Sequence, residues 1–183
     1  MFKNIFETKV YYSKLDLDIC NKAKLHIDNK QNEFQQKTWD CDIKTSLNYS
    51  PNILNSLELH ELKMNILSHL EMYMYQNNKF IDGYIYDSWV NIYEKDFFQE
   101  FHVHTHDCYK SLSGIVYLTE NNSEIIFNID NPYNFIPKFA DILIFPDDVP
   151  HRVRKNTNDN LRVSLAFNFK LCNLSKITSL KWS

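Results

Sequence analysis

Glycine is scarce in this chain, whose 183 residues contain only two, Gly83 and Gly114. A phosphate-binding loop needs several closely spaced glycines, so this count excludes the Gly-rich nucleotide-binding motifs. Turns must instead be formed by asparagine and aspartate, which tolerate left-handed backbone conformations and bond to their own backbone. We therefore expect the chain to turn at its Asn- and Asp-rich clusters.

Paired cysteines, long apolar runs and excess basic charge are also lacking. The cysteines form no C-x-x-C pair and are widely spaced, at Cys20, Cys41, Cys108 and Cys172. We expect reduced thiols in a cytoplasmic protein. No apolar run reaches the roughly 18 residues of a membrane span, and the first residues lack the apolar core of a secretory signal. The net charge of −3 and pI of about 6.1 argue against a nucleic-acid partner without excluding one.

Apolar residues recur at helical spacing in two N-terminal segments. The first runs from about 15 to 36, and Ser13 or Asp16 could cap its start. The second begins at Asn55 or the next residue and ends near residue 78. The sequence predicts two helices here, preceded by a strand at 5–12 that enters the domain.

The apolar period changes from 3.6 toward 2 after Gly83. Short strand-like runs separated by turn clusters follow at 84–93, 99–104, 112–119, 124–129, 142–146, 150–154 and 161–170. Regularly spaced short strands of this kind indicate a sandwich or barrel. We predict a single domain over 1–183, with a β core over about 84–170 and helical support over about 13–78. The stretch Trp39–Tyr49 has no clear period.

The strand-like run 99–104 carries histidines that could bind a metal. Side chains alternate faces along a strand, so His102 and His104 share one face while Phe101 and Val103 take the other. His151 follows a second apolar run and could bring a third imidazole from a distant strand. Histidine is the commonest metal ligand, so the pattern predicts a metal site inside a β-barrel. His106 is close enough in sequence to be an alternative ligand.

These histidines and their flanking residues resemble the iron(II)- and 2-oxoglutarate-dependent oxygenases, most of all a small bacteriophage and bacterial branch. The matching motifs are Trp89-Val90-Asn91, Gln99-Glu100-Phe101-His102-Val103-His104, Ser113-Gly114-Ile115-Val116-Tyr117-Leu118, Ile144-Phe145-Pro146, His151 and Arg162-Val163-Ser164-Leu165-Ala166-Phe167-Asn168. The resemblance covers roughly 84–170. It implies a mainly β (α+β) fold, a double-stranded β-helix or cupin-like jelly roll with two supporting N-terminal helices. It also implies an oxidoreductase that uses Fe(II) and 2-oxoglutarate, a dioxygenase acting as a hydroxylase.

The resemblance implies that His102, His104 and His151 are the metal ligands. The family usually has H-x-D or H-x-E at the first pair, whereas this chain has His104 at the second position. Losing a carboxylate changes the charge of the site by one unit. Related branches tolerate histidine there, so iron remains the expected metal, and Asp107 could substitute as the acidic ligand.

Spacing to upstream residues selects between the two possible histidine pairs. In related prolyl hydroxylases and alkylated-nucleic-acid demethylases, a tyrosine lies nine residues before the first ligand, and the demethylases place an asparagine two residues earlier. Tyr93 and Asn91 stand at these offsets from His102. This favours the pair His102/His104 over His104/His106. By the same resemblance, Tyr93, Asn91 and Tyr117 would hydrogen-bond the cosubstrate.

Arg162 lies eleven residues after His151, where family members place the cation that binds the distal carboxylate of 2-oxoglutarate. A guanidinium can bind a carboxylate through two parallel hydrogen bonds. Ser164 shares its strand face and could add another. We expect Trp89, Phe145 and Phe167 to be core residues rather than site residues.

The alternative function is a cupin-like metal-binding jelly roll, non-catalytic or with different chemistry, because a fold does not dictate function. Cupins also use H-x-H, but follow it with a glutamate and a Gly-rich second motif, which this chain lacks. Arg162 discriminates, since a plain cupin has no need of it. A peptide side chain, a small metabolite and a nucleobase remain open as substrates, and the acidic pI argues mildly against the last.

Overall fold

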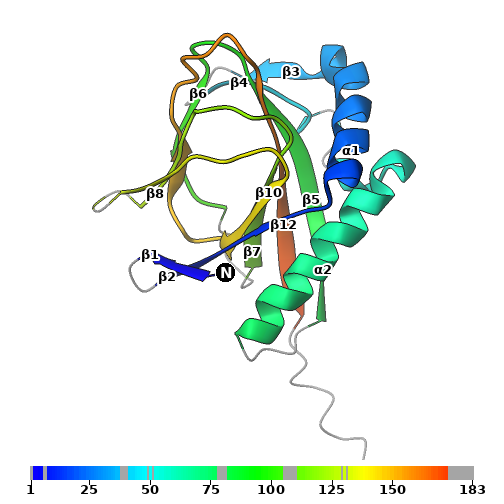
Figure 1. Ribbon diagram of the computed structural model, residues 1–183, viewed down its shortest axis with the longest axis vertical. Helices are drawn as coiled ribbons and strands as arrows, with labels where there is room; N and C mark the ends of the chain where they lie inside the picture. The colour runs from blue at the N-terminus through cyan, green and yellow to red at the C-terminus, as the bar shows by residue number, and fades with distance from the viewer. Residues whose placement is uncertain are drawn as a thin grey trace, which may run out of the picture.

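A curled antiparallel sheet with two helices along one side makes up the protein (Figure 1). The computed structural model describes residues 2–5, 8–37, 41–48, 50, 52–77, 82–104, 111–128, 130 and 132–172. No helix in these ranges has the length and apolarity needed to cross a membrane.

The strands of the described ranges are hydrogen-bonded in one path. Their bounds are β1 Phe2–Ile5, β2 Thr8–Lys14, β3 Gln35–Lys37, β4 Cys41–Thr45, β5 Asp82–Tyr93, β6 Phe98–His102, β7 Ser111–Tyr117, β8 Ile125–Phe127, β9 Tyr133–Phe135, β10 Asp141–Pro146, β11 His151–Val153 and β12 Arg162–Cys172. The order is β1-β2-β10-β7-β12-β5-β4-β6-β11-β8-β9, and β3 pairs with β4 beside it. Because β4 pairs with both β5 and β6, it joins the larger sheet to the smaller one. The result is a jelly roll.

The helices α1 (Leu17–Lys30) and α2 (His60–Gln76) cover the sheet along β5 and β12 (Figure 1). The Asp16 side chain caps α1 by accepting a hydrogen bond from the Ile19 backbone N–H at 3.0 Å. Short 3-10 turns at Ile53–Asn55 and Leu57–Leu59 precede α2. Each helix buries one apolar stripe against the sheet, as the sequence period predicts.

Strand β5 shows how the sheet separates two cores. Val90 and Ile92 are buried against the helices, in the larger hydrophobic cluster. Asn91 and Tyr93 alternate with them and are buried inside the barrel. The same alternation in β7 and β12 places polar side chains in the barrel interior, where the candidate site lies.

The two helices and the jelly roll confirm the predicted fold class, but the β structure extends beyond the predicted 84–170. Strand β2 overlaps the strand predicted at 5–12 and pairs with β10, whereas β4, also from the first 45 residues, joins the two sheets. Strands β3, β4 and β9 were not predicted. The second helix begins at His60, not near Asn55, because 3-10 turns occupy the intervening residues.

Candidate metal centre

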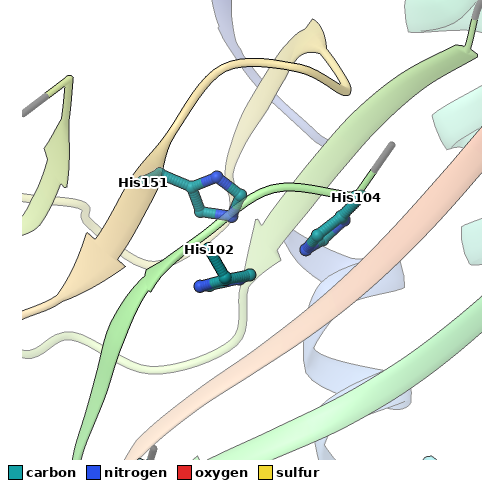
Figure 2. Close-up of side chains that lie close together, drawn as sticks. All are labelled: His102, His104 and His151. Atoms are coloured by element: carbon teal, nitrogen blue, oxygen red, sulfur yellow. The ribbon is translucent and has the colours of Figure 1, made fainter. Parts of the chain in front are cut away.

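Three histidine side chains meet inside the barrel (Figure 2). His102 is the last residue of β6 and lies opposite His151, the first residue of β11. Their ring centroids are 4.2 Å apart, and the His104 ring is 5.1 Å from each. One nitrogen from each ring lies within 4.8 Å of the other two. His104 follows the end of β6 instead of lying within the strand, and its backbone N–H donates to the Asp147 carbonyl at 2.9 Å.

Backbone carbonyls fix the rings of His102 and His151. His102 Nδ1 lies 2.9 Å from the Glu100 carbonyl, and His151 Nδ1 lies 3.0 Å from the Val149 carbonyl. A carbonyl oxygen can only accept, so each Nδ1 carries the proton and each Nε2 keeps its lone pair for a metal. Metal-binding histidines are commonly oriented in this way by the hydrogen bond of the second nitrogen.

Side chains from two further strands orient His104. Its Nδ1 lies 2.9 Å from Asn168 Oδ1 on β12 and 3.0 Å from Ser113 Oγ on β7. The Ser113 hydroxyl also donates to Asn168 Oδ1 at 2.9 Å, so its oxygen can accept from His104. The arrangement again assigns the proton to Nδ1 and the lone pair to Nε2.

Burial favours the neutral imidazoles of His102 and His151. It lowers the pKa of His102, and it lowers the pKa of His151 well below the ordinary value, with the neighbouring His102 and His104 adding to the effect. A histidine must be deprotonated to bind a metal. These rings are therefore ready to bind at neutral pH.

The three histidines form part of the wall of a narrow cavity inside the barrel. The lining residues are Trp89, Asn91, Tyr93, Gln99, His102, His104, Ile115, His151, Val153, Arg162, Ser164 and Ala166. Trp89 was expected in the core, and this was wrong: its ring lines the cavity 5.5 Å from the His104 ring. Trp89, Asn91 and Tyr93 alternate along the end of β5 and all line the cavity, which explains its position.

The other two aromatic residues expected in the core are buried there. Phe167 lies in the cluster beneath the helices, and Phe145 lies in the barrel cluster with its ring 4.9 Å from that of His151.

Arg162 is buried at the start of β12 and is only 1% exposed. Its Nη1 donates to the carbonyls of Ser123 at 2.8 Å and Glu124 at 3.3 Å. The guanidinium lies between two aromatic rings, with Cζ 5.4 Å from the centroid of Tyr93 and 5.4 Å from that of Tyr117. Its Nε is buried and has no hydrogen-bond partner in the part of the chain that the structure describes.

The described residues offer Arg162 no carboxylate to pair with. An unpaired buried charge costs several kcal/mol, about 3–5 kcal/mol where a partner has been removed. The Tyr117 hydroxyl beside it is also buried and has no hydrogen-bond partner among the described residues, and burial raises its pKa to about 12. Ser164 lines the same cavity. Together these groups form a pocket suited to an anion.

Comparison with solved structures places this arrangement in a known fold. A prolyl-4-hydroxylase from Pseudomonas putida matches with a TM-score of 0.65 at 14% identity, over 88% of this chain and 91% of that one. A viral collagen prolyl hydroxylase from Paramecium Bursaria Chlorella virus-1, in a 2-oxoglutarate complex, matches with a TM-score of 0.63 at 14% identity, over 88% and 97%. HygX from Streptomyces hygroscopicus, with nickel, 2-oxoglutarate and hygromycin B bound, matches with a TM-score of 0.60 at 8% identity, over 89% and 82%.

The fold is that of the 2-oxoglutarate–iron(II) oxygenases. No protein-family model matches the sequence, and the search of curated proteins returned no match. The likeness therefore lies in the fold, and membership of the bacteriophage branch stays a prediction.

Within this oxygenase fold, two predicted cosubstrate contacts bond to protein neighbours. The Tyr93 hydroxyl donates to Gln99 Oε1 at 2.7 Å. The Asn91 amide, turned to satisfy its neighbours, donates to Thr45 Oγ1 at 2.9 Å and accepts from Trp89 Nε1 at 3.2 Å. Both residues line the cavity, and their roles toward a cosubstrate stay predictions.

The structure adds three residues to the predicted site: Gln99, Ser113 and Asn168. Gln99 links Tyr93 to the triad, because its Nε2 lies 3.3 Å from His102 Nε2. All three stand in the motifs quoted above, and Asn168 continues the alternation of Arg162 and Ser164 along β12. This alternation along the strand was the signal in the sequence that could have identified Asn168 as a site residue. The alternative ligands His106 and Asp107 lie outside the described residues.

Proposed function

We propose that this chain is an Fe(II)- and 2-oxoglutarate-dependent dioxygenase that hydroxylates a small-molecule or peptide substrate. The observation that carries the proposal is Arg162, a buried guanidinium without a described carboxylate partner, in the same cavity as three convergent histidines. The oxygenase fold and the bound ligands named for HygX and the viral hydroxylase support it.

The residues present fit these two groups. The three histidines would hold iron through their Nε2 atoms, and three protein ligands are the number that non-haem iron(II) oxygenases use. Arg162 would receive the distal carboxylate, using its unpartnered Nε and with the Tyr117 hydroxyl beside it. When bound, iron and 2-oxoglutarate supply the oxidising chemistry, and succinate and CO2 are the coproducts. The chain's own residues bind, orient and exclude water.

The alternative, a cupin-like metal-binding module, is favoured by one observation: among the described residues, the candidate ligands are three histidines without a carboxylate. It leaves the burial of Arg162 unexplained. A plain metal-binding barrel has no reason to bury a cation that needs an anion, so we place this function second.

Titration of the anaerobic Fe(II) protein with 2-oxoglutarate tests the proposal, using the metal-to-ligand absorption band as the signal. Removing one partner of a buried ion pair costs about 3–5 kcal/mol, which is roughly two to four decades in affinity. Arg162→Ala should therefore raise the 2-oxoglutarate Kd at least about a hundredfold. Arg162→Lys should be intermediate, since it keeps the charge but loses the planar fork.

Arg154→Ala is the matched control, because it removes an exposed arginine that pairs with Glu124 at 3.2 Å. It should leave the titration unchanged. Circular dichroism checks whether Arg162→Ala is folded. If it is not folded, the Arg162→Lys titration tests the proposal in its place. A wild-type protein without the absorption band, or a folded Arg162→Ala protein with an unchanged Kd, would favour the cupin-like function.

A further inference from the structure

We propose that Asn156, in the turn between β11 and β12, is a positioning residue for Arg162 and thereby gives the site its preference for a 2-oxo acid with a second carboxylate. The proposal rests on the proposed function and deepens it, because it identifies what fixes the anion-binding group. Asn156 begins one of the Asn-rich clusters at which the sequence predicts turns. Connecting turns normally lie at the surface, yet Asn156 is 0% exposed.

The side-chain amide of Asn156 makes hydrogen bonds at both of its ends. Its Nδ2 donates to the Tyr93 carbonyl at 3.0 Å and to the Asn160 carbonyl at 3.0 Å. Its Oδ1 accepts from Asn121 Nδ2 at 3.2 Å and from Ser123 Oγ at 3.1 Å. These bonds use both donors and both lone pairs of the amide. Because a carbonyl oxygen can only accept, they also determine which end of the amide faces Tyr93.

These bonds reach both segments that surround the Arg162 guanidinium. On one side, the Ser123 carbonyl accepts from Arg162 Nη1 at 2.8 Å, and the hydroxyl of the same serine is bound to Asn156. On the other side, the Tyr93 ring lies 5.4 Å from Arg162 Cζ, and the Tyr93 carbonyl is bound to Asn156. One amide therefore connects the carbonyl that binds the guanidinium to the residue whose ring flanks it.

Asn121 holds the same serine through its backbone. Its Oδ1 accepts from the Ser123 N–H at 2.8 Å, and its Nδ2 also donates to the Asn160 carbonyl at 3.0 Å. Ser123 precedes β8, so it lies outside the strands of the sheet. The side chains of Asn121 and Asn156 therefore fix the carbonyl to which Arg162 is bound.

The orientation of Arg162 matters because its partner would be a carboxylate. A guanidinium and a carboxylate form two parallel hydrogen bonds only when their planes are aligned. A guanidinium that can move must first be ordered, and that cost reduces affinity. This role concerns the distal carboxylate alone. Asn156 should therefore affect the binding of a dicarboxylic 2-oxo acid and leave the binding of a monocarboxylic one unchanged, which a general loss of stability would not do.

The test compares 2-oxoglutarate with pyruvate, which has the same keto acid end but lacks the second carboxylate. Each acid is titrated into the anaerobic Fe(II) protein, and the metal-to-ligand absorption band gives its Kd. The wild type should bind 2-oxoglutarate at least about a hundredfold more tightly than pyruvate, the factor expected for a buried ion pair. Asn156→Ala should raise the 2-oxoglutarate Kd about tenfold, the equivalent of one hydrogen bond, and leave the pyruvate Kd unchanged.

Asn158→Ala is the matched control, because it removes an asparagine side chain from the same turn. This side chain reaches Asn121 Oδ1 and Asn156 Oδ1 at 3.4 Å, which is long for a hydrogen bond. The closer contact, from the Asn158 backbone N–H to Asn156 Oδ1 at 3.1 Å, survives the substitution. Both Kd values should remain as in the wild type.

A double variant shows whether Asn156 acts through the guanidinium. In an Arg162→Ala background, Asn156→Ala should have no further effect on the 2-oxoglutarate Kd. An equal effect in both backgrounds would overturn the inference, as would an Asn156→Ala protein that binds 2-oxoglutarate like the wild type. Equal weakening of both acids would also overturn it, because the substitution would then act on the whole cavity.

If Asn156→Ala does not fold, Asn121→Ala takes its place. It removes the bond to the Ser123 N–H and should lower the preference for 2-oxoglutarate over pyruvate at least about threefold. An unchanged preference in this variant would contradict the inference. A wild type without an absorption band for either acid is a separate result, which would overturn the proposed function and this role with it.

Discussion

His102 and His151 are held by backbone geometry more than by their side-chain neighbours. Both Nδ1 atoms bond to carbonyls two residues earlier in the chain, and the two residues pair directly across β6 and β11. Their position therefore follows from strand register alone. His104 differs, because its ring depends on side chains from β7 and β12.

The first prediction at this scale is that His102→Ala or His151→Ala abolishes stoichiometric Mn(II) binding, measured by calorimetry at saturating 2-oxoglutarate. Either change removes one of three ligands and leaves two, too few to hold the ion in a fixed position. His60→Ala, on the exposed face of α2, is the control and should bind as the wild type does.

The same calorimetry checks the choice of ligand pair. His106→Ala should weaken binding only slightly. If His106→Ala removed the metal while His102→Ala did not, the assignment would be displaced by two residues along the chain.

At the scale of elements, the Phe167 ring of β12 lies over Gly114 of β7 and occupies the space that a side chain at Gly114 would need. Gly114 pairs with Phe167, and a Cβ at Gly114 would lie 2.0 Å from Phe167 Cζ. Phe167 is fully buried beneath the helices, so its ring has little room to move. In the S-G motif, Gly114 therefore leaves room for the Phe167 ring, and Ser113 contributes a hydrogen bond to His104.

Gly114→Ala should lower the free energy of unfolding by about 1–3 kcal/mol, the usual penalty for overpacking a core. Urea denaturation followed by circular dichroism measures it. Phe167→Leu should relieve the clash, so the double variant should be more stable than the sum of the two single effects predicts. Strict additivity would show that the contact with Phe167 is not the source of the strain.

Sequence reasoning reached the elements whose pattern is local and missed those decided by pairing. The helical stripes and the alternation in β5 and β12 were visible in the sequence. Strand β4 shows a buried-alternating pattern over only five residues, Cys41–Thr45, and its role depends on pairing with both β5 and β6. β9 is three residues long and is identified by pairing with β8.

The residues of the site also fall into two groups, those that the sequence predicted and those that only the structure identified. His102, His104, His151 and Arg162 belong to motifs with fixed spacing, and the structure brings all four to one cavity. Asn168 on β12 contacts His104, 64 residues earlier in the chain, so the spacing of residues could not assign it. Gln99 is close in sequence to its partners Tyr93 and His102, but only the folded positions of the three side chains identify these contacts.

At the scale of the whole molecule, buried neutral histidines connect the fold to pH. His69 on α2 bonds to the Tyr11 hydroxyl of β2 at 2.8 Å, which ties the helical layer to the sheet. Burial lowers its pKa, as it does the pKa of His102 and His151. In the unfolded chain each imidazole returns to a pKa of about 6.5.

Below that pH the unfolded chain binds more protons than the folded chain, so the free energy of unfolding should fall as the pH drops. Above about pH 6.5 the contribution of these histidines is fully present. Each one can add a slope of up to about 1.4 kcal/mol per pH unit between its two pKa values. Urea midpoints of the EDTA-treated protein, measured from about pH 7.5 to 5, should therefore decrease steadily on acidification.

His69→Gln isolates one of these contributions. Glutamine can still accept a hydrogen bond from Tyr11, but it does not titrate. The number of protons that the chain takes up on unfolding below about pH 6.5, which sets the slope of the unfolding free energy with pH, should therefore decrease by up to one. The slope that remains belongs to the other groups that titrate in this range, including His102 and His151, whose rings face the barrel interior rather than the helices. A variant with an undiminished slope would mean that His69 becomes protonated in the folded protein as readily as in the unfolded chain, despite its burial at the helix–sheet interface.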